Sequence, residues 1–162
     1  MTDARAGVPL VVKAGWGAGE LGMTAAEFFV QVYLLKLYTE GVGLEPGAAG
    51  LALALAVAWD AAADPLVGAL SDRTRTGWGK RRPYFILGAP ALALTFVLLF
   101  APPALASQVG KAAFLLSSYL LFNTAMAVVT VPHTALGGEL SDDPGERTAL
   151  FGWRFLFINL GL

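Results

Sequence analysis

The chain of 162 residues contains no cysteine and one histidine, and only 14% of its residues are charged. Without cysteine it can form neither a disulfide scaffold nor a thiolate metal site, and one histidine cannot make a zinc-binding cluster. The charged fraction is roughly half of the ~25% typical of soluble domains, and 11 basic residues balance 12 acidic ones. This composition excludes a disordered tail, a coiled coil and a nucleic-acid-binding protein. Because 56% of the residues are apolar, a membrane-embedded helical protein remains.

The apolar residues come in runs long enough to cross a bilayer, which takes about 20 helical residues. Residues 84–103 and 112–138 contain no Asp, Glu, Lys or Arg, and the second stretch argues against a soluble Ala-rich bundle. No signal-peptide pattern precedes the first apolar segment, so we expect that segment to be retained. We predict an all-α polytopic membrane protein with spans at about 14–38, 47–70, 84–103, 111–136 and an incomplete fifth at 149–162.

Most cations fall on one side of this topology. The side that holds the N-terminus carries nine basic residues, and the opposite side carries only Lys36 and Lys111. Because short cytoplasmic loops retain Lys and Arg, we predict a multi-pass protein of the inner or plasma membrane with a cytoplasmic N-terminus. The nine residues are Arg5, Lys13, Arg73, Arg75, Lys80, Arg81, Arg82, Arg147 and Arg154.

Four acidic residues lie inside the predicted spans, where each would cost roughly 2.5–3.5 kcal/mol at the middle of a lone helix. Asp60 and Asp64 are four residues apart and share one helix face, and Glu20, Thr24 and Glu27 follow one polar stripe of the first span. We expect the two aspartates to point toward the first and fourth helices. Because neighbouring carboxylates repel when both are ionised, such a pair favours binding of a proton or a small cation.

Further polar residues extend the candidate substrate cavity. Asn123 and Thr130 of the fourth span and Arg154 of the fifth join the polar stripe of the first. For the hydroxyl and amide groups, hydrogen bonding within and between helices is the favoured alternative to a cavity role. For His133 a place near the cytoplasmic membrane boundary is favoured over a proton relay.

The inner loop after the second span combines an acid, two glycines and a basic triplet. Its simplest role is the positive-inside signal, but contacts made in one state and broken in the other would also form a cytoplasmic gate. The candidate gate residues from this loop and the next inner loop are Gly68, Asp72, Arg73, Gly79, Lys80, Arg81, Arg82, Glu146 and Arg147.

One run of the sequence resembles a known family. The run is Trp59-Asp60-Ala-Ala-Ala-Asp64-Pro65-Leu-Val-Gly68, followed by Ser71-Asp72-Arg73-Thr74 and Gly79-Lys80-Arg81-Arg82-Pro83. It resembles the glycoside-pentoside-hexuronide:cation symporters of the major facilitator superfamily. The resemblance extends from about Lys13 to the end of the chain, with Val131-Pro132, Glu146-Arg147-Thr148 and Arg154 in register.

The resemblance implies a twelve-helix transporter of two six-helix halves, of which this chain is the first part. It implies a substrate site near the midplane and Na⁺, Li⁺ or H⁺ as the coupling ion, bound by Asp60 and Asp64, with Arg154 beside the sugar. No cofactor is expected, and the complete protein is expected to be monomeric. Five helices cannot complete an alternating-access pore, so we expect this stretch to be inactive by itself.

The chain departs from the family pattern at several positions. Ala63 stands where the family has an asparagine, and Ala127 where it has a cation-site threonine. The two aspartates and the tryptophan that hold a galactoside fall on Thr24, Thr130 and Thr134. Since Na⁺ needs several oxygen ligands and H⁺ needs one carboxylate, these losses favour H⁺, with Na⁺ at Asp60 and Asp64 as the alternative.

We therefore predict a cation-coupled symporter of a small solute, most simply a sugar or glycoside. The alternatives are a symporter of lysolipids or other amphiphiles and a non-transporting membrane scaffold. An enzyme is disfavoured, because the sequence contains no nucleophile-and-base constellation and no HExxH zinc motif.

Overall fold

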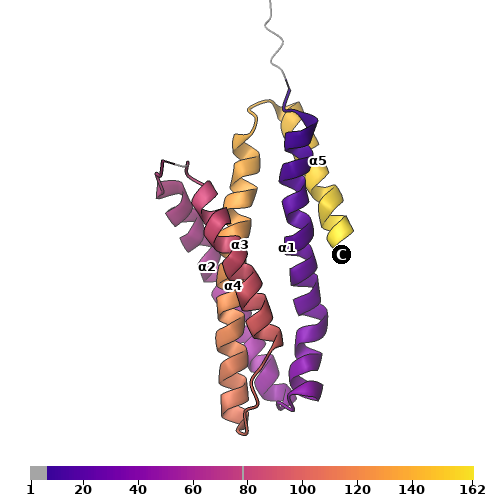
Figure 1. Ribbon diagram of the computed structural model, residues 1–162, viewed down its shortest axis with the longest axis vertical. Coiled ribbons are helices and arrows are strands. Elements are labelled where there is room, and N and C mark those ends of the chain that lie inside the picture. Colours follow the sequence, from indigo (N-terminus) through magenta and orange to yellow (C-terminus); the bar gives the residue numbers. More distant parts are fainter. Residues whose placement is uncertain (1–6, 78) are drawn as a thin grey trace, which may run out of the picture. The chain divides into compact units, whose positions relative to one another are not determined.

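A computed structural model describes residues 7–77 and 79–162 (Figure 1). These residues form α1 (Leu10–Lys36), a short π-helix η1 (Leu37–Gly41), α2 (Pro46–Arg73), α3 (Arg82–Phe100), α4 (Gln108–Glu139) and α5 (Pro144–Gly161). The predicted all-α fold is confirmed. By length and composition α2, α3 and α4 can each cross a membrane, whereas the membrane crossing of the more highly charged α1 and α5 stays a prediction. Arg5, counted above among the cytoplasmic cations, lies outside the described residues.

Proline and acidic residues set several helix ends. Pro46 and Pro144 occupy the first turns of α2 and α5, where the missing N–H costs no hydrogen bond. At α5 the carboxylate of Asp143 accepts a hydrogen bond from the backbone N–H of Glu146 at 2.8 Å, which caps the helix. The apolar stretch after α3 ends in Pro102 and Pro103, which cannot continue a helix, and α3 ends at Phe100.

The chain divides into two compact units. The central unit is Phe29–His133, which holds the end of α1, all of α2 and α3 and most of α4. The terminal unit joins the chain up to Phe28 with Thr134–Leu162. Both boundaries fall inside helices, α1 and α4, so each of these helices contributes to both units.

In the central unit α2 packs on α4 along a seam of small residues. Ala63 and Val67 of α2 lie against Ala127 of α4 in one buried cluster. The Asn123 side-chain amide of α4 donates a hydrogen bond to the backbone carbonyl of Ala56 at 3.1 Å. Small side chains let helix backbones approach closely, which is how helices associate where no hydrophobic driving force acts between them.

The same unit brings α3 onto the other side of α4. A Cβ built on Gly88 of α3 would lie 2.7 Å from Cγ2 of Val129, so this contact requires a glycine. Near the predicted outer end, the Tyr38 hydroxyl donates to the backbone carbonyl of Leu99 at 3.0 Å. The side chain of Gln108 ties the turn after η1 to the start of α4 by donating to the carbonyl of Gly43 at 2.9 Å.

In the terminal unit α1 packs directly on α5. A Cβ on Gly17 would lie 3.1 Å from the backbone carbonyl of Trp153, and one on Gly161 would lie 2.8 Å from the backbone oxygen of Leu21. Trp16 fills the space next to this contact, since its indole lies against Gly137 of α4 and meets the ring of Phe151 edge-on at 5.6 Å.

Candidate functional site

The two aspartates of α2 lie on a face of that helix that does not pack on α4. The buried surface of α2 toward α4 is made by Ala56, Ala63 and Val67, whereas Asp60 is half-buried and Asp64 is exposed. The expectation that both carboxylates point toward the fourth helix is therefore wrong for Asp64. The physical reason is that alanine and valine make the closer contact, which leaves the charged face of the helix uncovered by α4.

The helix turn that carries these acids is nevertheless held firmly. The indole N–H of Trp59, next to Asp60, donates a hydrogen bond to Oγ1 of Thr124 on α4 at 3.0 Å. One turn earlier on α2, the amide of Asn123 holds the carbonyl of Ala56. These two bonds fix the α2 backbone just before the acidic pair, so the spacing and direction of the two carboxylates are set by α4.

Two other polar groups of α4 make contacts of a structural kind. Thr130 is half-buried and its hydroxyl donates to the backbone carbonyl of Met126 in its own helix at 3.0 Å. His133 is 7% exposed, and its ring lies edge-on to Phe85 with the centroids 6.1 Å apart. These contacts, like that of Asn123, fit hydrogen bonding and packing between helices.

The structure joins two of the predicted cavity residues from distant parts of the chain. Nε of Arg154 on α5 donates to Oε1 of Glu20 on α1 at 2.5 Å. The Glu20 side chain is 7% exposed and that of Arg154 is 22% exposed. Thr24, one turn further along α1, is half-buried, and Glu27 is exposed. A charge-assisted bond of this length in so covered a place is among the stronger polar contacts a protein makes.

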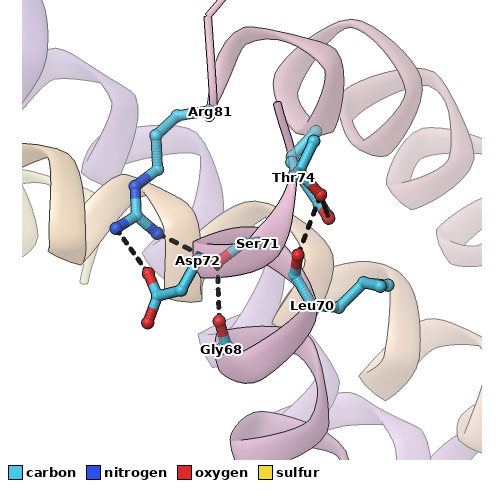
Figure 2. A network of polar contacts seen from close by, with 7 residues as sticks. Gly68, Leu70, Ser71, Asp72, Thr74 and Arg81 are labelled. Atoms are coloured by element: carbon cyan, nitrogen blue, oxygen red, sulfur yellow. Dashed lines mark hydrogen bonds and ion pairs between the residues drawn. The ribbon is translucent and has the colours of Figure 1, made fainter. Parts of the chain in front are cut away.

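The loop between α2 and α3 contains a second polar network, shown in Figure 2. The guanidinium of Arg81 donates through Nη2 to Oδ1 of Asp72 and through Nη1 to Oγ of Ser71, each at 2.9 Å. The Ser71 hydroxyl in turn donates to the carbonyl of Gly68 at 3.0 Å. Arg81 therefore closes the carboxyl end of α2, where a cation is favoured by the helix dipole.

The remaining loop cations are not drawn into this network. Arg73, Lys80 and Arg82 are exposed, as expected for a positive-inside signal. Gly79 has a φ of +97° and its N–H donates to the carbonyl of Thr76 at 3.0 Å. This left-handed conformation explains the glycine in the basic loop.

The other two gate candidates, Glu146 and Arg147, belong to the terminal unit. Oε2 of Glu146 lies 2.7 Å from Nζ of Lys13 and accepts from the backbone N–H of Val8 at 3.0 Å. The hydrogen bond from Lys13 lowers the pKa of the Glu146 carboxyl, aided by the N–H of Val8 and opposed by desolvation. Arg147 donates to the backbone carbonyls of Ser141 and Gly138. These contacts tie the start of α1 to the start of α5.

Sequence reasoning missed several of these partners. Ser71 stands beside Asp72 in the motif already quoted, so its place at the end of α2 was a usable signal. The bond from Trp59 to Thr124 joins residues 65 apart in the chain. No local pattern announces that bond or the pairing of Lys13 with Glu146, because both depend on which helices pack together.

Comparison with known proteins adds to this geometry. Residues 15–162 match the family model described as MFS/sugar transport protein. The chain is 36% identical over 149 residues to the inner membrane symporter YicJ and 37% identical over 152 residues to the putative glycoside/cation symporter YagG, both from Escherichia coli (strain K12). Each alignment covers 92% of this chain and 32% of the relative. A third relative, 33% identical over 138 residues, is the sodium-dependent lysophosphatidylcholine symporter 1-B of Danio rerio, of which 25% is covered.

An all-α chain with membrane-crossing helices, acids inside them and a basic inner loop is a multi-pass membrane protein of the transporter class. More specifically, the chain belongs to the MFS/sugar transport protein family, and its similarity to these symporters places it with the glycoside-pentoside-hexuronide:cation symporters of the major facilitator superfamily. The chain spans about a third of the length of the curated relatives that it matches best in coverage. The resemblance drawn from the Asp60 to Pro83 motifs is thereby confirmed, as is the prediction of a transporter rather than an enzyme.

Proposed function

We propose that this chain forms the first part of a symporter that moves a small solute together with a cation by alternating access. The observation that carries the proposal is the pair Asp60 and Asp64, one turn apart on a membrane-crossing helix and on the face that α4 leaves uncovered. An acid in a membrane span that is turned away from the helix packing points to a functional rather than a structural role. In the complete transporter this face would line the central cavity.

We further propose H⁺ as the coupling ion, with Na⁺ as the alternative. The positions where neutral oxygen ligands would be expected hold Ala63 and Ala127, and both side chains are buried in the apolar cluster between α2 and α4. They supply packing and no oxygen. Na⁺ requires several oxygen ligands, whereas a carboxylate pair can bind one proton between its members.

The proposed solute is a sugar or glycoside. The pair Glu20 and Arg154 offers both a hydrogen-bond acceptor and hydrogen-bond donors, which suits a molecule rich in hydroxyl groups. Thr24 and Thr130 lie in the part of the cavity where the family's sugar-binding acids would be, so the mode of sugar binding differs from the galactoside pattern. A lysolipid, which the Danio rerio relative's name mentions, is the alternative solute.

The proposed gate is the network of Asp72, Arg81 and Ser71 at the cytoplasmic end of α2 (Figure 2). The Asp72 side chain is 68% exposed although it is ion-paired. It can therefore exchange Arg81 for another partner as the transporter changes state. We propose a cell-membrane location with a cytoplasmic N-terminus, which places this network and the basic loop inside the cell.

The test is uptake by the full-length transporter that contains this chain, in membrane vesicles with an imposed proton or sodium gradient. We expect Asp64→Asn to abolish concentrative uptake while the amount of protein in the membrane stays unchanged. Asp142→Asn is the matched control, since Asp142 is a fully exposed loop acid that lies 3.6 Å from Arg147. Unaltered concentrative uptake by the Asp64 variant would refute the role of the acidic pair, and uptake driven only by sodium would refute the preference for protons.

A further inference from the structure

The salt bridge between Glu20 and Arg154 lies wholly within the terminal unit and joins α1 to α5. An isolated arginine in a membrane span is costly, and a carboxylate at 2.5 Å neutralises it. The two side chains are not covered equally. The carboxylate is 7% exposed, and the guanidinium is 22% exposed. A ligand entering here would meet a partly open set of N–H donors backed by a covered negative charge.

Helix packing prevents the carboxylate from moving away from the arginine. Gly17 and Gly161 allow the backbones of α1 and α5 to touch on either side of the salt bridge, at Trp153 and at Leu21. Glu20 lies between Gly17 and Leu21 on α1, within about one helical turn of both contacts. The negative charge therefore stays beside the guanidinium when a ligand approaches.

This arrangement discriminates between solutes by charge. The bond to Glu20 engages Nε, one of the five N–H donors of the guanidinium. A neutral sugar can accept hydrogen bonds from the other donors and can donate a hydroxyl to the carboxylate. An anionic solute, such as a glycosiduronate or a phosphate-bearing lipid, would gain the arginine but would lie next to a fixed negative charge, and like charges held close together oppose binding.

We infer that Glu20 is a specificity-determining residue that restricts the cavity to neutral, hydroxyl-rich solutes and rejects anionic ones. The inference rests on the proposed symport function. It goes beyond that function by naming the charge class of the solute and the residue that selects it. It also predicts that removing the negative charge, without changing the shape of the side chain, opens the site to anions.

The experiment measures uptake by the full-length transporter of two labelled solutes, a neutral glycoside and the glycosiduronate with the same aglycone. We expect the wild-type protein to prefer the neutral solute, and we expect Glu20→Gln to shift the uptake ratio toward the anion by about tenfold or more. Glu20→Asp, which keeps the charge, should keep the preference. Glu40→Gln is the matched control, because Glu40 is an exposed residue of η1 whose carboxylate lies 3.9 Å from Lys36, and it should leave the ratio unchanged.

The outcomes separate the two levels of the argument. Cation-driven uptake in which the wild-type protein takes the anion as readily as the neutral solute would overturn the inference and leave the symport function standing. A ratio unchanged by Glu20→Gln, with normal protein abundance in the membrane, would do the same. If Glu20→Gln does not accumulate, the double variant Glu20→Gln with Arg154→Gln, which leaves no lone charge, must lose charge discrimination, and retained discrimination would overturn the inference. Absence of gradient-driven uptake of any solute would overturn the proposed function and the inference with it.

Discussion

Glycine-to-alanine substitutions along α1 give a sharp test of how α1 and α5 are held together. At Gly17 a new Cβ would lie 2.9 Å from Cδ2 of Phe157 and 3.1 Å from the backbone carbonyl of Trp153, whereas nothing lies within 4 Å of a Cβ at Gly15 or Gly22. The three glycines belong to the same helix and the same unit. Gly15→Ala and Gly22→Ala are therefore matched controls for Gly17→Ala.

The expected magnitudes follow from two opposing terms. Alanine is favoured over glycine in a helix interior by roughly 0.8–1 kcal/mol, a gain that all three variants share. Forcing an extra carbon into a closely packed contact costs roughly 1–3 kcal/mol, and only Gly17→Ala incurs this cost, because the backbone of Trp153 cannot move aside as a flexible side chain could. Gly17→Ala should therefore be less stable than either control by about 1–3 kcal/mol.

The measurement is the free energy of unfolding of the full-length transporter in mixed micelles, obtained by titration with a denaturing detergent. Gly161→Ala is a second case from the other helix, since its Cβ would lie 2.8 Å from the backbone oxygen of Leu21. Equal stability of Gly17→Ala and Gly15→Ala would refute the close packing of α1 on α5. It would also remove the physical reason for holding Glu20 beside Arg154.

Three further predictions concern single polar contacts. Because its salt bridge to Lys13 lowers the pKa of Glu146, this residue should contribute stability above the ordinary pKa of glutamate, and that contribution should be lost as the pH falls through the lowered pKa. Glu146→Gln should accordingly flatten the acid limb of a plot of unfolding free energy against pH, and an unchanged limb would contradict the assignment. Arg81→Ala removes a charge-assisted bond to a buried serine hydroxyl and should cost roughly 1–3 kcal/mol, whereas the exposed neighbour Arg82→Ala should stay within about 0.5 kcal/mol, and faster proteolysis of the loop between α2 and α3 in the Arg81 variant alone is the readout. Asn123→Ala breaks the bond to the α2 backbone and should cost roughly 0.6–2 kcal/mol in the same micelle titration, and a stability equal to that of the unsubstituted protein would show that α4 does not hold α2 through this bond.

The sequence predicted much of the fold because the relevant signals are local. The length of the apolar runs indicates helices that can cross a membrane, and proline and glycine mark where several of them begin and end. The helical period also places Asp60 and Asp64 on one face without any knowledge of neighbouring helices. The motifs from Asp60 to Pro83 were specific enough to indicate the family, since they combine an acidic pair in a membrane span with a basic loop at a set distance.

The helical period states which residues share a face, but it does not state which way that face turns. Alanine and valine pack on α4 more closely than charged groups can, so tertiary packing turned Asp64 away from α4, against the expectation from sequence. Pairing across the chain was equally out of reach, since Glu20 and Arg154 are 134 residues apart and their contact exists only because glycines let α1 and α5 touch. The amino-acid sequence by itself determined the helices, their spacing of acids and the family, whereas only the tertiary structure decided which charges meet, because that depends on the shapes of surfaces brought together from distant parts of the chain.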